Sequence, residues 1–186
     1  NTFMESHRAM RKQIFGSRDI LQFEVGPIDP ESNAMRRVDV HALNLHLTEG
    51  DNAVYVPNFL FRLDRALASF RKGVRFEQRP DVFGDLGPKD IHLVFTDGSD
   101  QFPDTLKFSS LYSFLEFGDI TLHVLSYLIP TQGRLYLTCE IGSPEDNDKD
   151  REVRVAEVSV GGLCEAMEAT LALVASEYDG NKSFLS

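Results

Sequence analysis

The sequence contains no tryptophan, only two cysteines and no long hydrophobic run. Its longest apolar stretch, residues 120–128, is interrupted by Thr121, His123 and Ser126. A membrane-spanning helix needs about 20 consecutive apolar residues, so this stretch is too short and too polar to cross a bilayer. No hydrophobic segment typical of a signal peptide is present either. We therefore expect a cytoplasmic protein with no membrane partner.

The two cysteines, Cys139 and Cys164, lie far apart and form no CxxC pattern. Cys139 falls within an alternating strand pattern, and Cys164 lies near the expected start of a helix. Isolated cysteines in such positions are typical of buried free thiols rather than of a disulfide or a nucleophile. This use of cysteine is compatible with a reducing compartment.

Sequence patterns for catalysis and for cofactor binding are also missing. Residues 84–87 do not fit the GxxxxGK[ST] phosphate-binding loop, and residues 98–100 do not fit a GxSxG nucleophile elbow. His41 and His46 are five positions apart, which places them on opposite faces of a regular strand, although a bulge could bring them together. No HxH, HxxxH or HExxH spacing occurs. We therefore predict no catalytic residue, no cofactor and no metal ligand, and a protein that is not an enzyme.

The most polar segment, residues 143–150, invites a calcium-binding interpretation because it is rich in carboxylates. An EF-hand loop requires glycine at its sixth position and glutamate at its twelfth. Counted from Asp146, the sixth position is Arg151 and the twelfth is Glu157, so the glycine requirement fails. We interpret the segment as solvated surface, with contact to a basic partner as the alternative.

Positive charge is scarce in the second part of the chain. Residues 1–79 hold 12 Lys and Arg against 10 Asp and Glu, whereas residues 80–186 hold 7 against 19. The net charge is therefore +2 in the first part and −12 in the second, which gives the −10 of the whole chain. A one-sided acidic field attracts basic partners and repels nucleic acids and anionic membranes. We expect a protein partner and no binding of nucleic acid.

Hydrophobic periodicity predicts both strands and helices. Residues 21–25 alternate as a strand, and residues 36–47 are expected to return beside them as a hairpin. Pro57 begins a helical pattern that Gly73 ends. Residues 163–174 repeat at helical spacing and predict a second long helix.

Shorter elements are expected around these. We predict a short helix at 4–13, a loop at 80–90, and strands over 74–78, 92–96, 106–108, 112–117, 120–127, 135–141 and 153–160. Runs of strands combined with separate helices favour an α+β fold. We therefore predict a single α+β domain over residues 1–186, with a largely antiparallel sheet and helices packed mainly on one face.

Seven acidic residues on two turns are candidate contacts for a basic partner. The first turn, residues 97–104, separates two of the expected strands, and the second turn follows the expected strand at 135–141. We expect the two turns to meet at one end of an antiparallel sheet. The candidate partner-binding residues are Asp97, Asp100, Asp104, Glu145, Asp146, Asp148 and Asp150.

Four segments within residues 14–70 carry a resemblance to a known family. They are Ile14-Phe15-Gly16-Ser17-Arg18-Asp19, then Phe23-Glu24-Val25, the return strand 38–47, and Asn52-Ala53-Val54-Tyr55-Val56-Pro57 leading into an amphipathic helix. These segments resemble the immunity proteins of bacterial polymorphic-toxin and contact-dependent inhibition systems. The resemblance implies a small, acidic, non-enzymatic α+β protein that binds a sibling toxin and occludes its active site.

Charge and resemblance together lead to one hypothesis about function. We expect an immunity protein that neutralises a basic, nuclease-like toxin, because proteins that engage phosphates are cationic. Two alternatives stay open. One is an acidic secretion chaperone or adaptor, which acts as a dimeric cradle with an exposed apolar groove. The other is an enzyme with a scattered active site.

Overall fold

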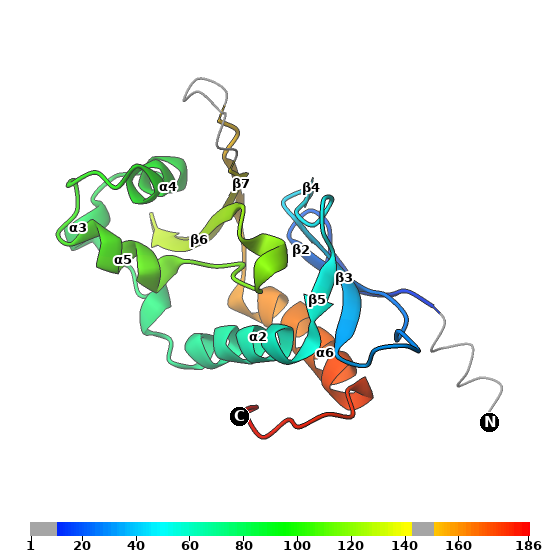
Figure 1. Cartoon of the computed structure of the whole chain (residues 1–186). Coiled ribbons are helices and arrows are strands. Elements are labelled where there is room, and N and C mark those ends of the chain that lie inside the picture. Colours follow the sequence, from blue (N-terminus) through cyan, green and yellow to red (C-terminus); the bar gives the residue numbers. More distant parts are fainter. Residues whose placement is uncertain (1–10, 143–150) are drawn as a thin grey trace. The chain divides into compact units, whose positions relative to one another are not determined.

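The computed structural model describes residues 11–142 and 151–186, and Figure 1 traces its elements. The contacts within the chain divide it into two compact units, each with its own sheet. That residues 1–186 form the single domain expected from the sequence stays a prediction. Unit 1 therefore joins segments from both ends of the chain. It comprises Asn1–Ala68, Phe117–Leu122 and Val160–Ser186, and unit 2 comprises Ser69–Glu116 and His123–Ser159.

The sheet of unit 1 is antiparallel, with the strand order β1-β2-β3-β4, and β5 also pairs with β3. The pairing of β2 with β3 places Phe23 opposite Val40, so the predicted hairpin between these segments is confirmed. The strands are β1 (Gln13–Ser17), β2 (Leu21–Val25), β3 (Met35–Ala42), β4 (Leu45–His46) and β5 (Ala53–Tyr55).

The alternation of β2 separates an apolar face of the sheet from a polar face. On the apolar face, the ring of Phe23 lies 6.4 Å from that of Phe59 in α2 and 5.4 Å from that of Phe117, measured between centroids. All three side chains are buried. On the other face of β2, Glu24 is buried as well, and it is paired with charged side chains described below.

Two long helices contribute to unit 1. α2 (Val56–Arg71) places Pro57 in its first turn, where the missing backbone N–H of proline costs no helical hydrogen bond. α6 (Val160–Glu177) packs against β1 and β2 and buries Leu163, Met167 and Val174. Both helices lie where helical periodicity predicts them.

The turn after β3 differs from the prediction. Leu43 and Asn44 have φ values of 50° and 62°, so the chain reverses directly after Ala42 and β4 pairs back onto β3. His41 thereby lies opposite His46, and their rings stack with centroids 4.4 Å apart. The prediction that the two histidines lie on opposite faces is wrong, because a tight hairpin replaces the continuous return strand.

The sheet of unit 2 is antiparallel, with the strand order β6-β7-β8. Its strands are β6 (Val124–Thr131), β7 (Arg134–Ile141) and β8 (Arg154–Glu157), and the last two agree with strands predicted from alternation. β6 begins later than the strand predicted over 120–127, because the preceding residues form a short 3-10 helix, η2 (Asp119–Thr121).

Unit 2 has helices where a loop and further strands were predicted. The loop at 80–90 and the strand at 92–96 are replaced by α3 (Pro80–Phe83) and α4 (Pro88–Asp97). The strand predicted at 74–78 is the 3-10 helix η1 (Val74–Phe76), and α5 (Thr105–Tyr112) replaces the strand expected at 106–108. Of the strand expected at 112–117, only an isolated bridge between Ser113 and Tyr127 is present.

The sequence of α4 explains this error. Ile91, Val94 and Phe95 are buried, and their spacing is that of one helix face. Pro88 begins the helix, and Gly98 ends it with a φ of 62° in the left-handed region. The β-branched and aromatic side chains favour a strand by composition, but helical spacing and the two flanking signals outweigh that preference.

Helices and strands share the core of unit 2. The ring of Phe95 on α4 stacks on Tyr112 of α5 at 5.9 Å and lies 5.0 Å from Tyr127 of β6. The buried cluster consists of Phe83, Ile91, Val94, Phe95, Phe102, Tyr112, Tyr127 and Ile129. The predicted α+β fold with antiparallel strand pairing is therefore confirmed, with two sheets in place of the one expected.

Candidate partner-binding surface

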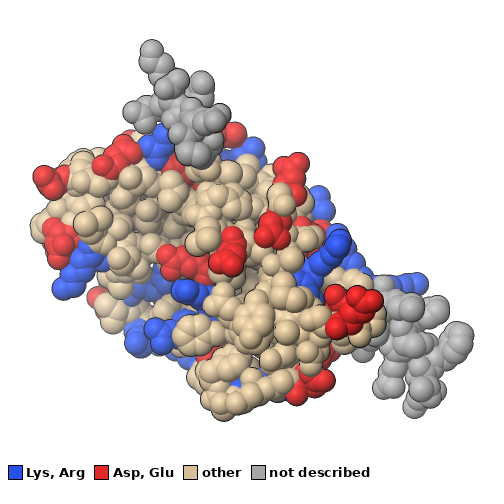
Figure 2. Space-filling view, in the orientation of Figure 1, with Lys and Arg blue, Asp and Glu red and all other residues tan. Residues whose placement is uncertain are grey.

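A strongly acidic surface covers the helical part of unit 2. Residues 80–104, which span α3, α4 and the connection to α5, contain six aspartates and a single lysine, Lys89. All seven residues are exposed, and Figure 2 shows acidic side chains along the edge of unit 2 over α3 and α4. We call the six aspartates the acidic helical surface: Asp81, Asp85, Asp90, Asp97, Asp100 and Asp104.

Three residues of this surface were predicted as partner contacts. Asp97, Asp100 and Asp104 are exposed, as expected, but they lie between no strands: Asp97 ends α4, and the other two lie in the connection from α4 to α5. Asp104 occupies the N-cap position of α5 with a φ of 53°. On α4, Asp90 and Asp97 are seven positions apart, which is about two helical turns, so they share one face of the helix.

The other three, Asp81, Asp85 and Asp90, were missed. Because residues 80–90 were interpreted as a loop and 92–96 as a strand, their common place on a helical layer was not recognised. The local charge count would have identified them. Six aspartates against one lysine is a far larger imbalance than that of the whole chain, which has 29 acidic and 19 basic residues.

Only the residue that follows the second predicted turn can be placed relative to the first turn. Arg151 directly follows this segment, and its Nη1 donates to Oδ1 of Asp97 at 2.6 Å. The residue after the second segment is therefore in contact with the first residue of the first one. The other predicted contacts, on the second turn, lie outside the described residues: Glu145, Asp146, Asp148 and Asp150. That the two turns meet therefore stays a prediction.

The charge division along the sequence does not coincide with the two units. The segments of unit 1 hold 9 Lys and Arg against 14 Asp and Glu, and those of unit 2 hold 10 against 15. Each unit therefore has a net charge of −5, because α6 from the acidic end of the chain packs with the slightly basic beginning. The local density of charge over residues 80–104 distinguishes the acidic helical surface from the rest.

A buried polar network fastens α4 to β7. The His92 ring is fully buried, with Nε2 at 2.9 Å from Oε1 of Glu140 and Nδ1 at 2.7 Å from Oγ1 of Thr138. Since an ionised carboxylate only accepts hydrogen bonds, Nε2 donates to Glu140, and Nδ1 of the neutral ring accepts from the Thr138 hydroxyl. Arg151 donates to both carboxylate oxygens of Glu140, with Nε at 3.1 Å from Oε2.

Burial and hydrogen bonding set the charges in this network. Burial lowers the pKa of His92, against the opposite influence of its hydrogen bond to Glu140. Burial acts to raise the pKa of Glu140, but hydrogen bonds from Arg151 and His92 outweigh it and hold that pKa below the ordinary value. Arg151 also donates to Asp97 and Thr96. The network therefore holds the end of α4, and with it one aspartate of the acidic helical surface, in place.

A second polar cluster lies on the polar face of the unit 1 sheet. The buried Glu24 forms ion pairs with Lys12 at 2.7 Å and with Arg18 at 2.8 Å. Asp39 lies 2.8 Å from Nε2 of His46. These contacts tie neighbouring strands together. Within residues 11–142 and 151–186, no group of three or more His, Cys, Asp and Glu side chains is arranged to hold a metal ion.

Two buried histidines make stability depend on pH. Burial lowers the pKa of His41 and of His92 below the ordinary 6.5, so the unfolded chain binds more protons than the folded protein near that pH. The resulting stability is present at higher pH and is lost as the pH falls. From about pH 7.5 to about pH 5.5, we expect the free energy of urea unfolding to decrease by at most about 1.4 kcal/mol per pH unit for each histidine.

The variant His92→Gln separates this effect from changes in overall charge. Glutamine keeps a hydrogen-bond donor for Glu140 but does not titrate, so we expect the variant to show a flatter dependence of unfolding free energy on pH. The other ionisable groups are the same in both proteins. An unchanged slope in His92→Gln would contradict the contribution of this histidine.

Cys139 is a buried free thiol, as the sequence predicts, whereas Cys164 is less deeply buried than expected. Cys139 is fully buried on β7, and burial raises the pKa of its thiol to about 12. Such a thiol is protonated at neutral pH and is a poor nucleophile. Cys164 is half-buried near the start of α6.

Comparison with protein-family models, with curated proteins and with solved structures gives no match to this chain. Among the residues that the structure describes, no helix is long and apolar enough to cross a membrane. The observations that bear on function are therefore the charge and exposure of the acidic helical surface and the network that supports it.

Proposed function

We propose that this protein is an immunity protein that binds a basic, nuclease-like toxin and blocks its active site through the acidic helical surface. The observation that carries the proposal is the charge of that surface, with six exposed aspartates against one lysine over residues 80–104. A nuclease that holds phosphates presents basic residues to them. A row of carboxylates matches that pattern and accelerates docking.

The supports beneath this surface favour binding without rearrangement. Asp97 is held by Arg151, and α4 is fastened to β7 by the hydrogen bond between His92 and Glu140. Groups that are ordered before association lose less conformational entropy when a partner binds. A preformed acidic surface is therefore suited to tight one-to-one inhibition.

The division of the chain is consistent with this function. Residues 14–70, which resemble immunity proteins, fall almost entirely in unit 1, whereas the acidic helical surface belongs to unit 2. Inhibitors of related toxins must bind their own partner and reject the others. A shared scaffold with a separate partner-specific surface meets that requirement.

Association kinetics with the product of the neighbouring gene test the proposal. We expect the double variant Asp90→Lys with Asp100→Lys to lower the association rate constant by about 10- to 100-fold at low ionic strength, because attraction becomes repulsion. The difference should shrink as salt screens the charges. Asp97 and Asp104 stay unchanged, because one pairs with Arg151 and the other stands at the start of α5.

Glu165→Lys with Glu168→Lys is the matched control. Both glutamates are exposed on α6, and the control changes the net charge by the same amount. We expect it to slow association by less than about threefold. Equal slowing by both variants would contradict a special role of the acidic helical surface. Absence of binding to the neighbouring product would overturn the proposed function, and a stable homodimer that binds an effector segment would favour the secretion-chaperone alternative.

A further inference from the structure

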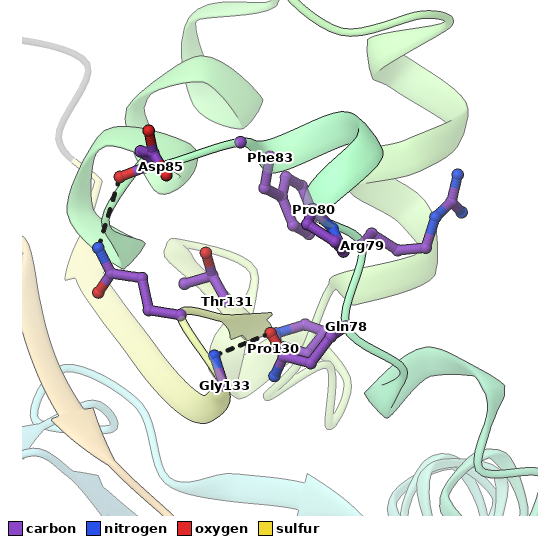
Figure 3. A pocket seen from close by; sticks show the side chains of 10 residues that line it. Gln78, Arg79, Pro80, Phe83, Asp85, Pro130, Thr131 and Gly133 are labelled. Atoms are coloured by element: carbon purple, nitrogen blue, oxygen red, sulfur yellow. Dashed lines mark hydrogen bonds between the residues drawn. The ribbon is translucent and has the colours of Figure 1, made fainter.

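A groove of about 390 Å³ lies in unit 2 next to the acidic helical surface (Figure 3). One wall is formed by residues 78–85, which contain α3, and the other wall by the end of β6 and the turn between β6 and β7. Asp85 belongs both to this groove and to the acidic helical surface. The groove is within the size range of protein sites that enclose a small molecule or a large side chain.

Hydrogen bonds across the groove hold its two walls together. Oε1 of Gln78 accepts from the backbone N–H of Gly133 at 3.2 Å, on the strand-turn side. Nε2 of Gln132 donates to the backbone oxygen of Asp85 at 3.4 Å, and both contacts are drawn in Figure 3. The groove is therefore formed before any partner binds.

The lining combines an apolar floor with a polar rim. Phe83 is only 2% exposed, and Pro80 and Pro130 add further apolar groups to the lining. Thr131 and the carboxylate-bearing Asp85 add polar groups at the edge. A floor of this kind accepts a hydrocarbon chain, and the acidic edge accepts a positive charge at the end of that chain.

The one cationic residue of the lining does not compete for this position. Figure 3 shows the Arg79 guanidinium directed away from the groove. It donates to both carboxylate oxygens of Asp81, at 2.9 Å and 2.8 Å, and lies over the ring of Phe108 at 5.4 Å from the centroid. The groove itself thus keeps its acidic character.

We infer that this groove is the docking site for an arginine side chain of the partner protein. The aliphatic part of the arginine packs on Phe83 and the two prolines, and its guanidinium pairs with the carboxylate of Asp85. Arginine suits the site better than lysine because its planar group is less strongly hydrated and stacks on aromatic and apolar surfaces. Arginine is also frequent among interface anchors that fill pockets. The inference rests on the proposed function and names the anchor that the partner contributes.

A titration of the full chain with N-acetyl-L-argininamide, followed by nuclear magnetic resonance, tests the groove without the partner. We expect saturable shifts at the backbone amides of Gly84, Asp85 and Gly133. N-acetyl-L-norleucinamide, which has an aliphatic chain without the guanidinium, should bind at least about fivefold more weakly. Shifts that avoid the groove, or equal binding of the two probes, would overturn the inference.

Two variants with the same change of charge locate the effect. Asp85→Asn removes a carboxylate that lines the groove, and Asp90→Asn removes one on α4 outside it. We expect Asp85→Asn to weaken argininamide binding by about fivefold and Asp90→Asn by less than about twofold. If both variants weaken argininamide binding equally, the binding reflects general attraction by the acidic helical surface. That result would overturn the inference of a specific arginine site.

The complex with the toxin separates this inference from the proposed function. We expect Asp85→Asn to raise the dissociation rate constant by about fivefold, because contacts in a pocket act on dissociation more than on encounter. If the toxin binds but argininamide does not bind the groove, the inference fails and the proposed function stands. If argininamide binds the groove but no toxin binds the protein, the proposed function fails and the groove remains a guanidinium site.

Discussion

Replacement of Glu140 by alanine is expected to lower the free energy of unfolding by about 3–5 kcal/mol, the usual cost of breaking a buried charge pair. Glu140 is 3% exposed and accepts hydrogen bonds from His92 and Arg151. Without the carboxylate, the buried Nε2–H of His92 loses its partner, and the half-buried guanidinium of Arg151 keeps, among the described residues, only Asp97 and Thr96. Urea unfolding followed by circular dichroism and by tyrosine fluorescence measures the effect, since the chain has five tyrosines and no tryptophan.

Glu157→Ala is the matched control for this prediction. Glu157 forms an ion pair with Arg134 at 2.6 Å, but both side chains are more than half exposed, so we expect a loss below about 1 kcal/mol. A double variant, Glu140→Gln with Arg151→Met, tests the cause. If an unpaired charge is responsible, the double variant loses less stability than the summed losses of the single variants Glu140→Gln and Arg151→Met. Additive losses would contradict that explanation.

Gly16→Ala is expected to destabilise unit 1 by about 2–4 kcal/mol, from backbone strain together with overpacking. Gly16 has a φ of 85°, and a Cβ atom built there overlaps the backbone oxygen of Leu21 and lies 3.0 Å from Cβ of Ala166 in α6. Only glycine allows the chain at position 16 to pass this close to the backbone of Leu21, and the tight contact with Ala166 adds to this requirement. The segment of residues 14–19 thus contains a glycine that the packing of unit 1 requires. Thermal and urea unfolding of the variant provide the measurement.

The control variant Gly73→Ala separates backbone strain from overpacking. Gly73 has a similar φ of 71°, but a Cβ atom there meets nothing within 4 Å. The control therefore retains the strain of a positive φ without the overlap, and we expect a loss of about 1 kcal/mol. If Gly16→Ala costs no more than Gly73→Ala, overlap with the Leu21 backbone and Ala166 is not the reason for glycine at position 16.

Elements with a long, regular pattern could be predicted from the sequence. α2 and α6 repeat their apolar residues over several turns, and β2 and β7 alternate cleanly, so local side-chain order determines which face is buried. Short apolar runs were less informative. Residues 91–95 contain β-branched and aromatic side chains, yet they form the middle of α4, because burial of three residues at helical spacing decides the conformation.

The candidate site was predicted only in part for a similar reason. Asp97, Asp100 and Asp104 were identified from charge and turn composition, which are local properties. The network of His92, Glu140 and Arg151 joins residues that are far apart in the sequence, and its members differ from exposed polar residues only by their burial. Such a network has no local signature, since any of these residue types also occurs on the surface.

The sequence by itself determined that this is an acidic α+β protein with two long amphipathic helices and an acidic excess in its second part. The tertiary structure alone decided how the charges are divided between the two units and what lies next to them. It distributed the net charge equally between the units, placed the aspartates of residues 80–104 on and between helices rather than on strands and a loop, and formed a groove beside them. The physical reason is that charge and periodicity are properties of neighbouring residues, whereas a surface is made by contacts between distant ones.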